Sequence, residues 1–329
     1  MKRIDIHSHV IPMTIVEAIR RDPERYGMTI PERDGKLYYE RRGQFSELRP
    51  VFYDADAKVE AMERMGLDIS VISVGPPVFF YYLSPDIGLE AAKLNNDGIA
   101  QMVAKRPDRL RGMAILPMQD PDAAITELER VVKEHGFKAV EIGTTIEGRQ
   151  LADERFRPLL KTIEQLGCFI FTHPYTCMAK GGMDEYHFGN LIGFPLDTTI
   201  MVGHLMFSGA LDELKKLRIV LTHGGGYVPY QIGRLADGHK VRPEGKAKTQ
   251  TSPYDLLRRF YFDALTHDAD AARHLIDKVG ADRVVLGTDD PFDMAPDDLL
   301  ASIDAIPDLT LDERAQICHK TALSLLGEQ

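Results

Sequence analysis

The sequence predicts an α/β protein built as a (β/α)8 barrel, and three observations lead to this class. Short apolar runs recur along the 329 residues, and segments with helical periodicity separate them. Strands that alternate with helices form parallel βαβ units, and eight such units fit a barrel best. An open, doubly wound sheet usually has a glycine-rich loop after its first strand. Here that position carries Asp5-Ile6-His7-Ser8-His9 instead.

We expect eight strands, one for each apolar run, with helices between them. The strands are Arg3–Ile6, Ile69–Val74, Leu110–Leu116, Ala139–Ile142, Cys168–Thr172, Ile219–Thr222, Tyr261–Asp263 and Arg283–Gly287. The helices include Ala55–Met65, Gly88–Lys105, Asp122–His135, Phe156–Leu166, Phe207–Lys216 and Ala269–Val279. Asp54 and Asp120 precede two of these helices as capping residues, because their carboxylates can accept hydrogen bonds from the first free N–H groups.

Two segments interrupt this alternation. Arg20–Tyr53 contains the strand-like run Lys36–Glu40 followed by Gly43, which predicts a small β insertion after the first strand. Ala179–Leu205 is expected to be a long connection after the fifth strand. Loops after barrel strands build active sites, so both segments either shape substrate access or form surface padding. We expect residues 1–329 to form a single domain that includes the insertion over about residues 20–53.

Composition argues against several classes of partner. The net charge is −10 and no strongly basic face is evident, so nucleic acid is not expected. No apolar run approaches the roughly 18–20 residues that span a bilayer, and His7 and His9 interrupt any signal-peptide core. Cys168, Cys177 and Cys318 are few and widely spaced, which is typical of reduced thiols in a cytoplasmic protein.

Polar side chains stand at the ends of four predicted strands, where a barrel gathers its catalytic groups. His7 and His9 are two positions apart on one strand, so both imidazoles can point to the same side. His173 follows the fifth strand and Asp289 follows the eighth. Each residue alone is usually a hydrogen-bonded or capping residue. Together, three imidazoles and a carboxylate predict a site for one divalent metal: zinc, or alternatively manganese, iron or cobalt.

Two further residues have predicted roles at this site. His223 begins the run His223-Gly-Gly-Gly226, and its imidazole can act as general acid or base because its ordinary pKa is about 6.5. Asp5 either orients a metal-binding histidine or forms a salt bridge at the strand end. The other histidines, His267 among them, lie outside this constellation and are expected to be structural.

With these residues in place, the chain resembles the amidohydrolase superfamily. The shared motifs are Asp5-x-His7-x-His9, Thr172-His173-Pro174, His223-Gly-Gly-Gly226 and Gly287-Thr-Asp289-x-Pro-Phe292. The branch it resembles contains aminocarboxymuconate-semialdehyde decarboxylase and related aromatic-acid decarboxylases. The resemblance implies a distorted, TIM-like (β/α)8 barrel of the metal-dependent hydrolase type. It also implies one divalent metal, usually zinc, and a homodimer as the active unit.

The resemblance also implies residues that bind substrate. Arg49 matches an arginine that binds the substrate carboxylate, and Arg234 matches one that reaches into the neighbouring subunit's site. Phe292 matches an aromatic residue beside the substrate. Tyr175 stands where the family has tryptophan.

Two other positions depart from the family pattern. Asp290 replaces an aromatic residue, and Asn190 stands near the position of another tryptophan. An added carboxylate and a lost aromatic wall would change the substrate pocket.

We therefore expect a metal-dependent, non-oxidative decarboxylase of an unsaturated or aromatic carboxylic acid. The metal and the arginines would stabilise developing negative charge, and His223 would either help deliver a proton to the carbon that loses CO2 or first activate the water. The same ligand set permits a hydrolase or hydratase that acts on a lactone, an amide or an unsaturated acid. A binding protein without activity is the third alternative.

Overall fold

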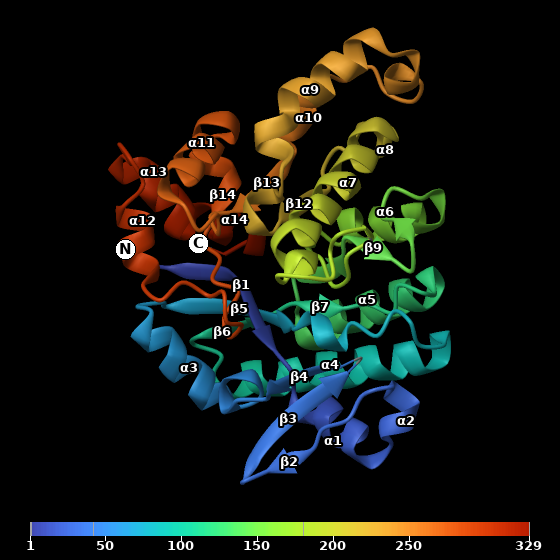
Figure 1. Cartoon of the computed structure of the whole chain (residues 1–329), viewed down its shortest axis with the longest axis vertical. Helices are drawn as coiled ribbons and strands as arrows, with labels where there is room; N and C mark the ends of the chain where they lie inside the picture. Colours follow the sequence, from blue (N-terminus) through green and yellow to red (C-terminus); the bar gives the residue numbers. More distant parts are fainter. Residues whose placement is uncertain (1, 42, 180, 329) are drawn as a thin grey trace.

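The computed structural model describes residues 2–41, 43–179 and 181–328, and its parallel strands surround a central core (Figure 1). Two parallel sheets contain these strands, in the orders β1-β5-β6 and β14-β13-β12-β11-β8-β7. The strands are β1 (Ile4–Val10), β5 (Ile69–Val74), β6 (Leu110–Gly112), β7 (Ala114–Ile115), β8 (Ala139–Gly143), β11 (Phe169–His173), β12 (Arg218–Leu221), β13 (Phe260–Asp263) and β14 (Val284–Val285). Each overlaps a predicted strand, so the parallel α/β fold is confirmed.

The two sheets meet at both seams without a continuous ladder. At one seam, β6 and β7 divide a single predicted strand around Met113, whose N–H donates to the Ile72 carbonyl at 3.0 Å. At the other seam, isolated bridges pair Asp5 with Leu286 and Ser8 with Asp290. The result is the expected distorted (β/α)8 barrel, with β6 and β7 counted as one strand.

Helices surround the strands (Figure 1). They are α1 (Met13–Arg21), α2 (Pro23–Tyr26), α3 (Ala55–Arg64), α4 (Pro85–Lys105), α5 (Pro121–His135), α6 (Arg157–Gln165), α7 (Phe194–Phe207), α8 (Ala210–Glu213), α9 (Val228–Val241), α10 (Pro253–Leu257), α11 (Ala269–Val279), α12 (Leu299–Asp304), α13 (Leu311–Ala315) and α14 (Thr321–Leu326). Asp54 and Asp120 cap α3 and α5 through hydrogen bonds from two backbone N–H groups each, as predicted. No helix in the described ranges is both long and apolar enough to cross a membrane.

The expected helix Phe207–Lys216 is wrong, and the long connection before it is largely helical. Helix α7 begins at Phe194 inside that connection, and the short helix α8 follows it. Pro195 lies in the first turn of α7, where proline's missing N–H costs nothing. Gly209 interrupts the helical path because its φ of 77° is left-handed.

The predicted β insertion is present after the first strand. It forms the antiparallel sheet β2 (Glu32–Arg33), β3 (Lys36–Arg41) and β4 (Gln44–Glu47), which lies near α1 and α2 in Figure 1. A separate two-stranded hairpin, β9 (Thr145–Ile146) and β10 (Arg149–Gln150), follows β8.

An apolar cluster fills the barrel below the polar strand ends. Phe169 and Phe171 of β11 belong to this cluster, and His173 continues the same side of the strand. Strand β1 is less regular, because its register against β5 shifts between Asp5 and Ser8. Such a shift lets the consecutive residues Ile6 and His7 both face the interior of the barrel, although neighbours in a regular strand face opposite sides. It thereby brings His7 and His9 above the apolar cluster that contains Ile6.

Candidate metal centre and adjoining pocket

The predicted ligands converge at the carboxyl ends of the barrel strands. Asp289 Oδ1 lies 3.2 Å from His7 Nε2, 3.1 Å from His9 Nε2 and 3.8 Å from His173 Nε2. Its other oxygen, Oδ2, lies 3.7 Å from His223 Nε2. The side chains of His7 and His9 are fully buried, whereas 17% of the His223 side chain is exposed.

The unpaired atoms of this cluster fit a divalent metal. Among the described residues, the Nε2 atoms of His7, His9 and His173 and Oδ1 of Asp289 are buried without a hydrogen-bond partner. Buried polar atoms are rarely left unpaired, and three imidazole nitrogens with one carboxylate oxygen form a zinc-type donor set. His223 is the partly exposed member, and its ligand atom lies within 4.8 Å of those of His7, His173 and Asp289, so it is close enough to be a ligand as well.

The second ring nitrogen of each ligand histidine is already engaged. His9 Nδ1 lies 3.1 Å from the Val74 carbonyl, and His173 Nδ1 lies 2.6 Å from the Pro174 carbonyl. A proton on Nδ1 therefore satisfies each carbonyl and leaves the Nε2 lone pair directed at the centre.

Electrostatics separates the three imidazoles: Asp289 and Asp263 outweigh burial and raise the pKa of His7 to about 10, so His7 must give up a proton to bind a metal. Burial lowers the pKa of His173 to about 3 and also lowers the pKa of His9, so both rings are neutral, as metal binding requires. Burial opposes a charge on Asp289, but His7 and the other imidazoles outweigh it and hold the pKa of its carboxyl well below the usual range.

Asp263 at the end of β13 orients His7, and the sequence prediction missed this residue. Its Oδ2 accepts a hydrogen bond from His7 Nδ1 at 2.7 Å, and its Oδ1 accepts one from the Gly224 N–H at 2.8 Å. One buried carboxylate thus connects a predicted metal ligand with the turn that carries His223. Asp263 ends the predicted strand Tyr261–Asp263, so its position at a strand end was an available signal.

Asp5, for which the sequence left open an orienting role or a salt bridge, contacts the backbone of His7. Its Oδ1 accepts a hydrogen bond from the His7 backbone N–H at 3.0 Å, and its Oδ2 accepts one from the Thr288 hydroxyl at 2.8 Å. Asp5 therefore fixes the backbone of β1 and of the loop after β14, whereas Asp263 fixes the imidazole.

Replacing Asp263 with asparagine is expected to weaken zinc binding by about 10- to 100-fold. An amide Nδ2 would face His7 Nδ1, and two donors cannot pair. The favourable response is a proton shift to His7 Nε2, which removes the lone pair that a metal needs. Competition against a chromophoric chelator measures the affinity, with Asp5→Asn as the matched control. Equal affinities of the Asp263→Asn variant and the unmodified protein would contradict this role.

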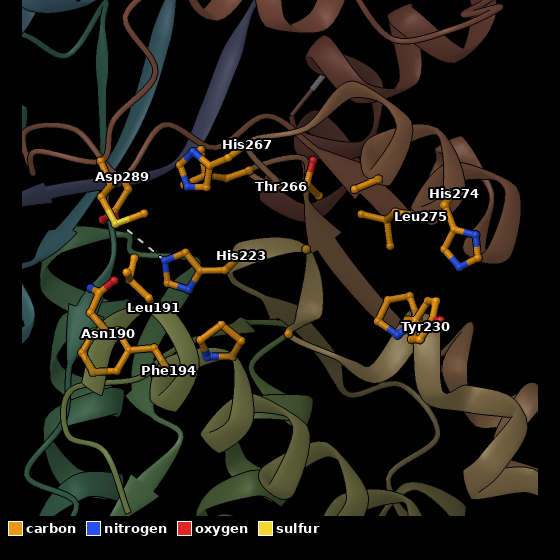
Figure 2. A pocket seen from close by; sticks show the side chains of 17 residues that line it. Asn190, Leu191, Phe194, His223, Tyr230, Thr266, His267, His274, Leu275 and Asp289 are labelled. Carbon is orange, nitrogen blue, oxygen red and sulfur yellow. Dashed lines mark ion pairs between the residues drawn. The ribbon is translucent and has the colours of Figure 1, made fainter. Parts of the chain in front are cut away.

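A cavity of about 530 Å³ opens beside the cluster (Figure 2). His223 and Asp289 lie toward one end of it, and Tyr230 and His274 lie toward the other (Figure 2). Asn190 and Phe194, at the start of the α7 region, also contribute to the wall. The lining described here contains three histidines and no lysine or arginine.

The two predicted aromatic substrate residues lie outside this lining. The Phe292 ring is 5.4 Å from the His9 ring and 5.5 Å from the Phe52 ring. Phe292 is thus adjacent to the ligand cluster. Tyr175 packs against Tyr81, and its hydroxyl donates to the Glu147 carboxylate at 3.3 Å.

The two predicted arginines also lie outside the lining. Arg49 ends the insertion, and its guanidinium donates a hydrogen bond to the Pro291 carbonyl, two residues after Asp289. Arg234 is exposed on α9, one turn after Tyr230. The structure therefore places Arg49 beside the ligand-bearing loop and leaves Arg234 on the surface.

Asp290, the added carboxylate, is paired with a buried lysine. Lys58 of α3 is fully buried, and its Nζ donates to Asp290 Oδ2 at 2.7 Å. The same ammonium donates to the carbonyls of His9 and Asp290. This carboxylate is thus part of an ion pair that connects α3, β1 and the loop after β14.

A barrel with a cluster of histidines and an aspartate at its strand ends is typical of metal-dependent enzymes, and similarity to known proteins gives the family. A model of the amidohydrolase family matches residues 4–327. The chain belongs to the amidohydrolase family, as its motifs predicted.

Known relatives with this similarity are carboxy-lyases. The chain is 31% identical to 2-amino-3-carboxymuconate-6-semialdehyde decarboxylase of Dictyostelium discoideum, over 99% of this chain and 91% of that protein. It is 31% identical to gamma-resorcylate decarboxylase of Polaromonas sp., over 75% of this chain and 80% of the relative. These relatives bear out the prediction of a carboxy-lyase of this superfamily.

A solved structure supports the fold independently. A dihydroxybenzoic acid decarboxylase from Polaromonas sp., crystallised with manganese and the inhibitor 2-nitroresorcinol, superimposes with a TM-score of 0.81. The alignment covers 99% of this chain and 97% of that one, at 23% identity.

Proposed function

We propose that this protein is a metal-dependent, non-oxidative decarboxylase of an aromatic or unsaturated carboxylic acid. The observation that carries the proposal is the set of four unpaired donor atoms from His7, His9, His173 and Asp289 beside a pocket that contains His223. The decarboxylase names of the relatives at 31% identity support the same reaction class.

In this proposal the four ligands hold one divalent ion, which when bound stabilises negative charge on the reacting acid. His223 lines the pocket, and its Nδ1 is buried without a partner in the described residues. A protonated His223 would deliver a proton from Nε2, which lies 3.7 Å from Asp289 Oδ2 at the edge of the pocket, to the carbon that loses CO2. Phe194 and Leu265 provide apolar wall and exclude water around the reacting atoms.

Zinc is the proposed native metal, because three nitrogens and one carboxylate oxygen match its usual ligands. Manganese is the main alternative, since a structurally similar decarboxylase was crystallised with it. A cytoplasmic homodimer is proposed as the active form. The exposed Arg234 would then supply the cation that the pocket of one chain lacks, and Arg49 would bind the substrate carboxylate from the insertion side.

The reaction class is tested by product analysis on zinc- or manganese-loaded protein. We expect stoichiometric CO2 from one acid of a panel that contains 2,6-dihydroxybenzoate, 5-carboxyvanillate and 2-amino-3-carboxymuconate 6-semialdehyde. A chelator should abolish the release, and added metal should restore it. The Asp289→Ala variant serves as the inactive control. Release of acid from lactones or amides without CO2 would instead identify a hydrolase.

A further inference from the structure

Three residues of the pocket share an unusual backbone conformation. His223, His267 and Asp289 have φ values of 53°, 57° and 59°, in the left-handed region that residues other than glycine rarely adopt. Nine non-glycine residues of the described ranges have positive φ, and these three line one cavity. Such strain concentrates at functional sites because the surrounding structure must hold it in place. His223 and Asp289 have proposed roles, whereas His267 has none.

The backbone around His267 is fixed from both sides. The residue lies on the loop between β13 and α11, where the Thr266 hydroxyl donates to the Asp268 carbonyl at 2.8 Å. Asp268 caps α11 by accepting the Ala271 N–H at 2.8 Å. Loops after barrel strands carry functional groups, and β13 ends in Asp263, which already orients His7. These contacts hold the backbone on either side of His267, and its exposed imidazole lines the pocket.

The side chains that line the pocket indicate what the imidazole of His267 could bind. In Figure 2, His267 lies at the same end of the cavity as Asp289 and His223. The lining includes no lysine or arginine from this chain, so the side-chain donors at that end are the imidazoles of His223 and His267 and the amide of Asn190. Burial also lowers the pKa of His267, which keeps the ring neutral, with one N–H donor, at neutral pH.

We propose that His267 is a substrate-binding residue that donates a hydrogen bond to a second oxygen of the acid, near its reacting carboxylate. This inference rests on the proposed function and adds His267 as the residue of this chain that binds the substrate's second oxygen. A plain aromatic acid would lack the atom that His267 recognises.

Calorimetric binding of 2,6-dihydroxybenzoate and benzoate to zinc-loaded protein tests the proposal without turnover. Two variants that tolerate left-handed φ form a matched pair: His267→Gly removes the donor, and His267→Asn keeps one. We expect His267→Gly to weaken binding of the dihydroxy acid by about five- to tenfold, the worth of one hydrogen bond, and to change benzoate binding less than about twofold. His267→Asn should recover part of the loss. Zinc content and melting temperature are measured for each variant.

Equal losses for both acids, or no loss for either, would overturn the assignment, as would failure of the unmodified protein to bind either acid. The expected binding pattern without CO2 release from any acid would support His267 as a ligand-binding residue and contradict the proposed decarboxylation instead.

Discussion

Replacing His223 with asparagine is expected to lower turnover by about 10²- to 10⁴-fold without loss of metal. Asparagine tolerates the left-handed backbone at this position, and its amide cannot transfer a proton at neutral pH. His223 is the partly exposed member of the cluster, and the four proposed metal donors, which are buried and unpaired, belong to His7, His9, His173 and Asp289. The variant should therefore bind zinc and substrate normally while the proton transfer fails.

The matched control is His187→Asn, because His187 is an exposed histidine with a φ of 61° outside the pocket. Rates of CO2 release, zinc content and acid binding are measured for both variants. An unchanged rate for His223→Asn would contradict the proton-donor role. Loss of zinc together with activity would instead identify His223 as a metal ligand. Zinc content is therefore measured, because His223 Nε2 lies only 3.7 Å from Asp289 Oδ2.

Replacing Lys58 with methionine is expected to lower the free energy of unfolding by about 3–5 kcal/mol. Methionine fills a similar volume but leaves the mostly buried Asp290 carboxylate without its cation. It also leaves the carbonyls of His9 and Asp290 without the Nζ donor. Because these groups adjoin two metal ligands, zinc affinity should fall as well.

The Asp290→Asn and Lys58→Met/Asp290→Asn variants complete the comparison, and urea denaturation measures stability. The double variant should be more stable than Lys58→Met alone, because no unpaired carboxylate then remains buried. Lys36→Met serves as the control, because Lys36 forms an exposed ion pair with Glu47. This substitution should lower the free energy of unfolding only slightly. A cost for Lys58→Met no larger than for Lys36→Met would show that the buried pair does not stabilise the fold.

The order of strands and the convergence of His7, His173 and Asp289 could be predicted from the sequence for a physical reason. Parallel βαβ units place the carboxyl ends of all strands on one side, so His173 and Asp289 must approach His7 wherever the intervening helices lie. The sequence was less informative where local signals compete. The helix placed at Phe207–Lys216 failed because Pro195 and Gly209 set the real boundaries of α7 and its successor.

The sequence by itself determined the eight strands, the residue types at their ends and hence the chemistry of a metal site. These follow from periodicity and strand polarity, which are local properties. Only the tertiary structure decided that Asp263 orients His7, that Lys58 neutralises Asp290 and that His267 lines the pocket. Each of these arrangements brings together residues that are far apart in the chain. Asp263 Oδ2 and His7 Nδ1, for example, lie 2.7 Å apart although 256 positions separate the two residues. Such contacts depend on how the barrel packs and closes, and no local pattern encodes that packing.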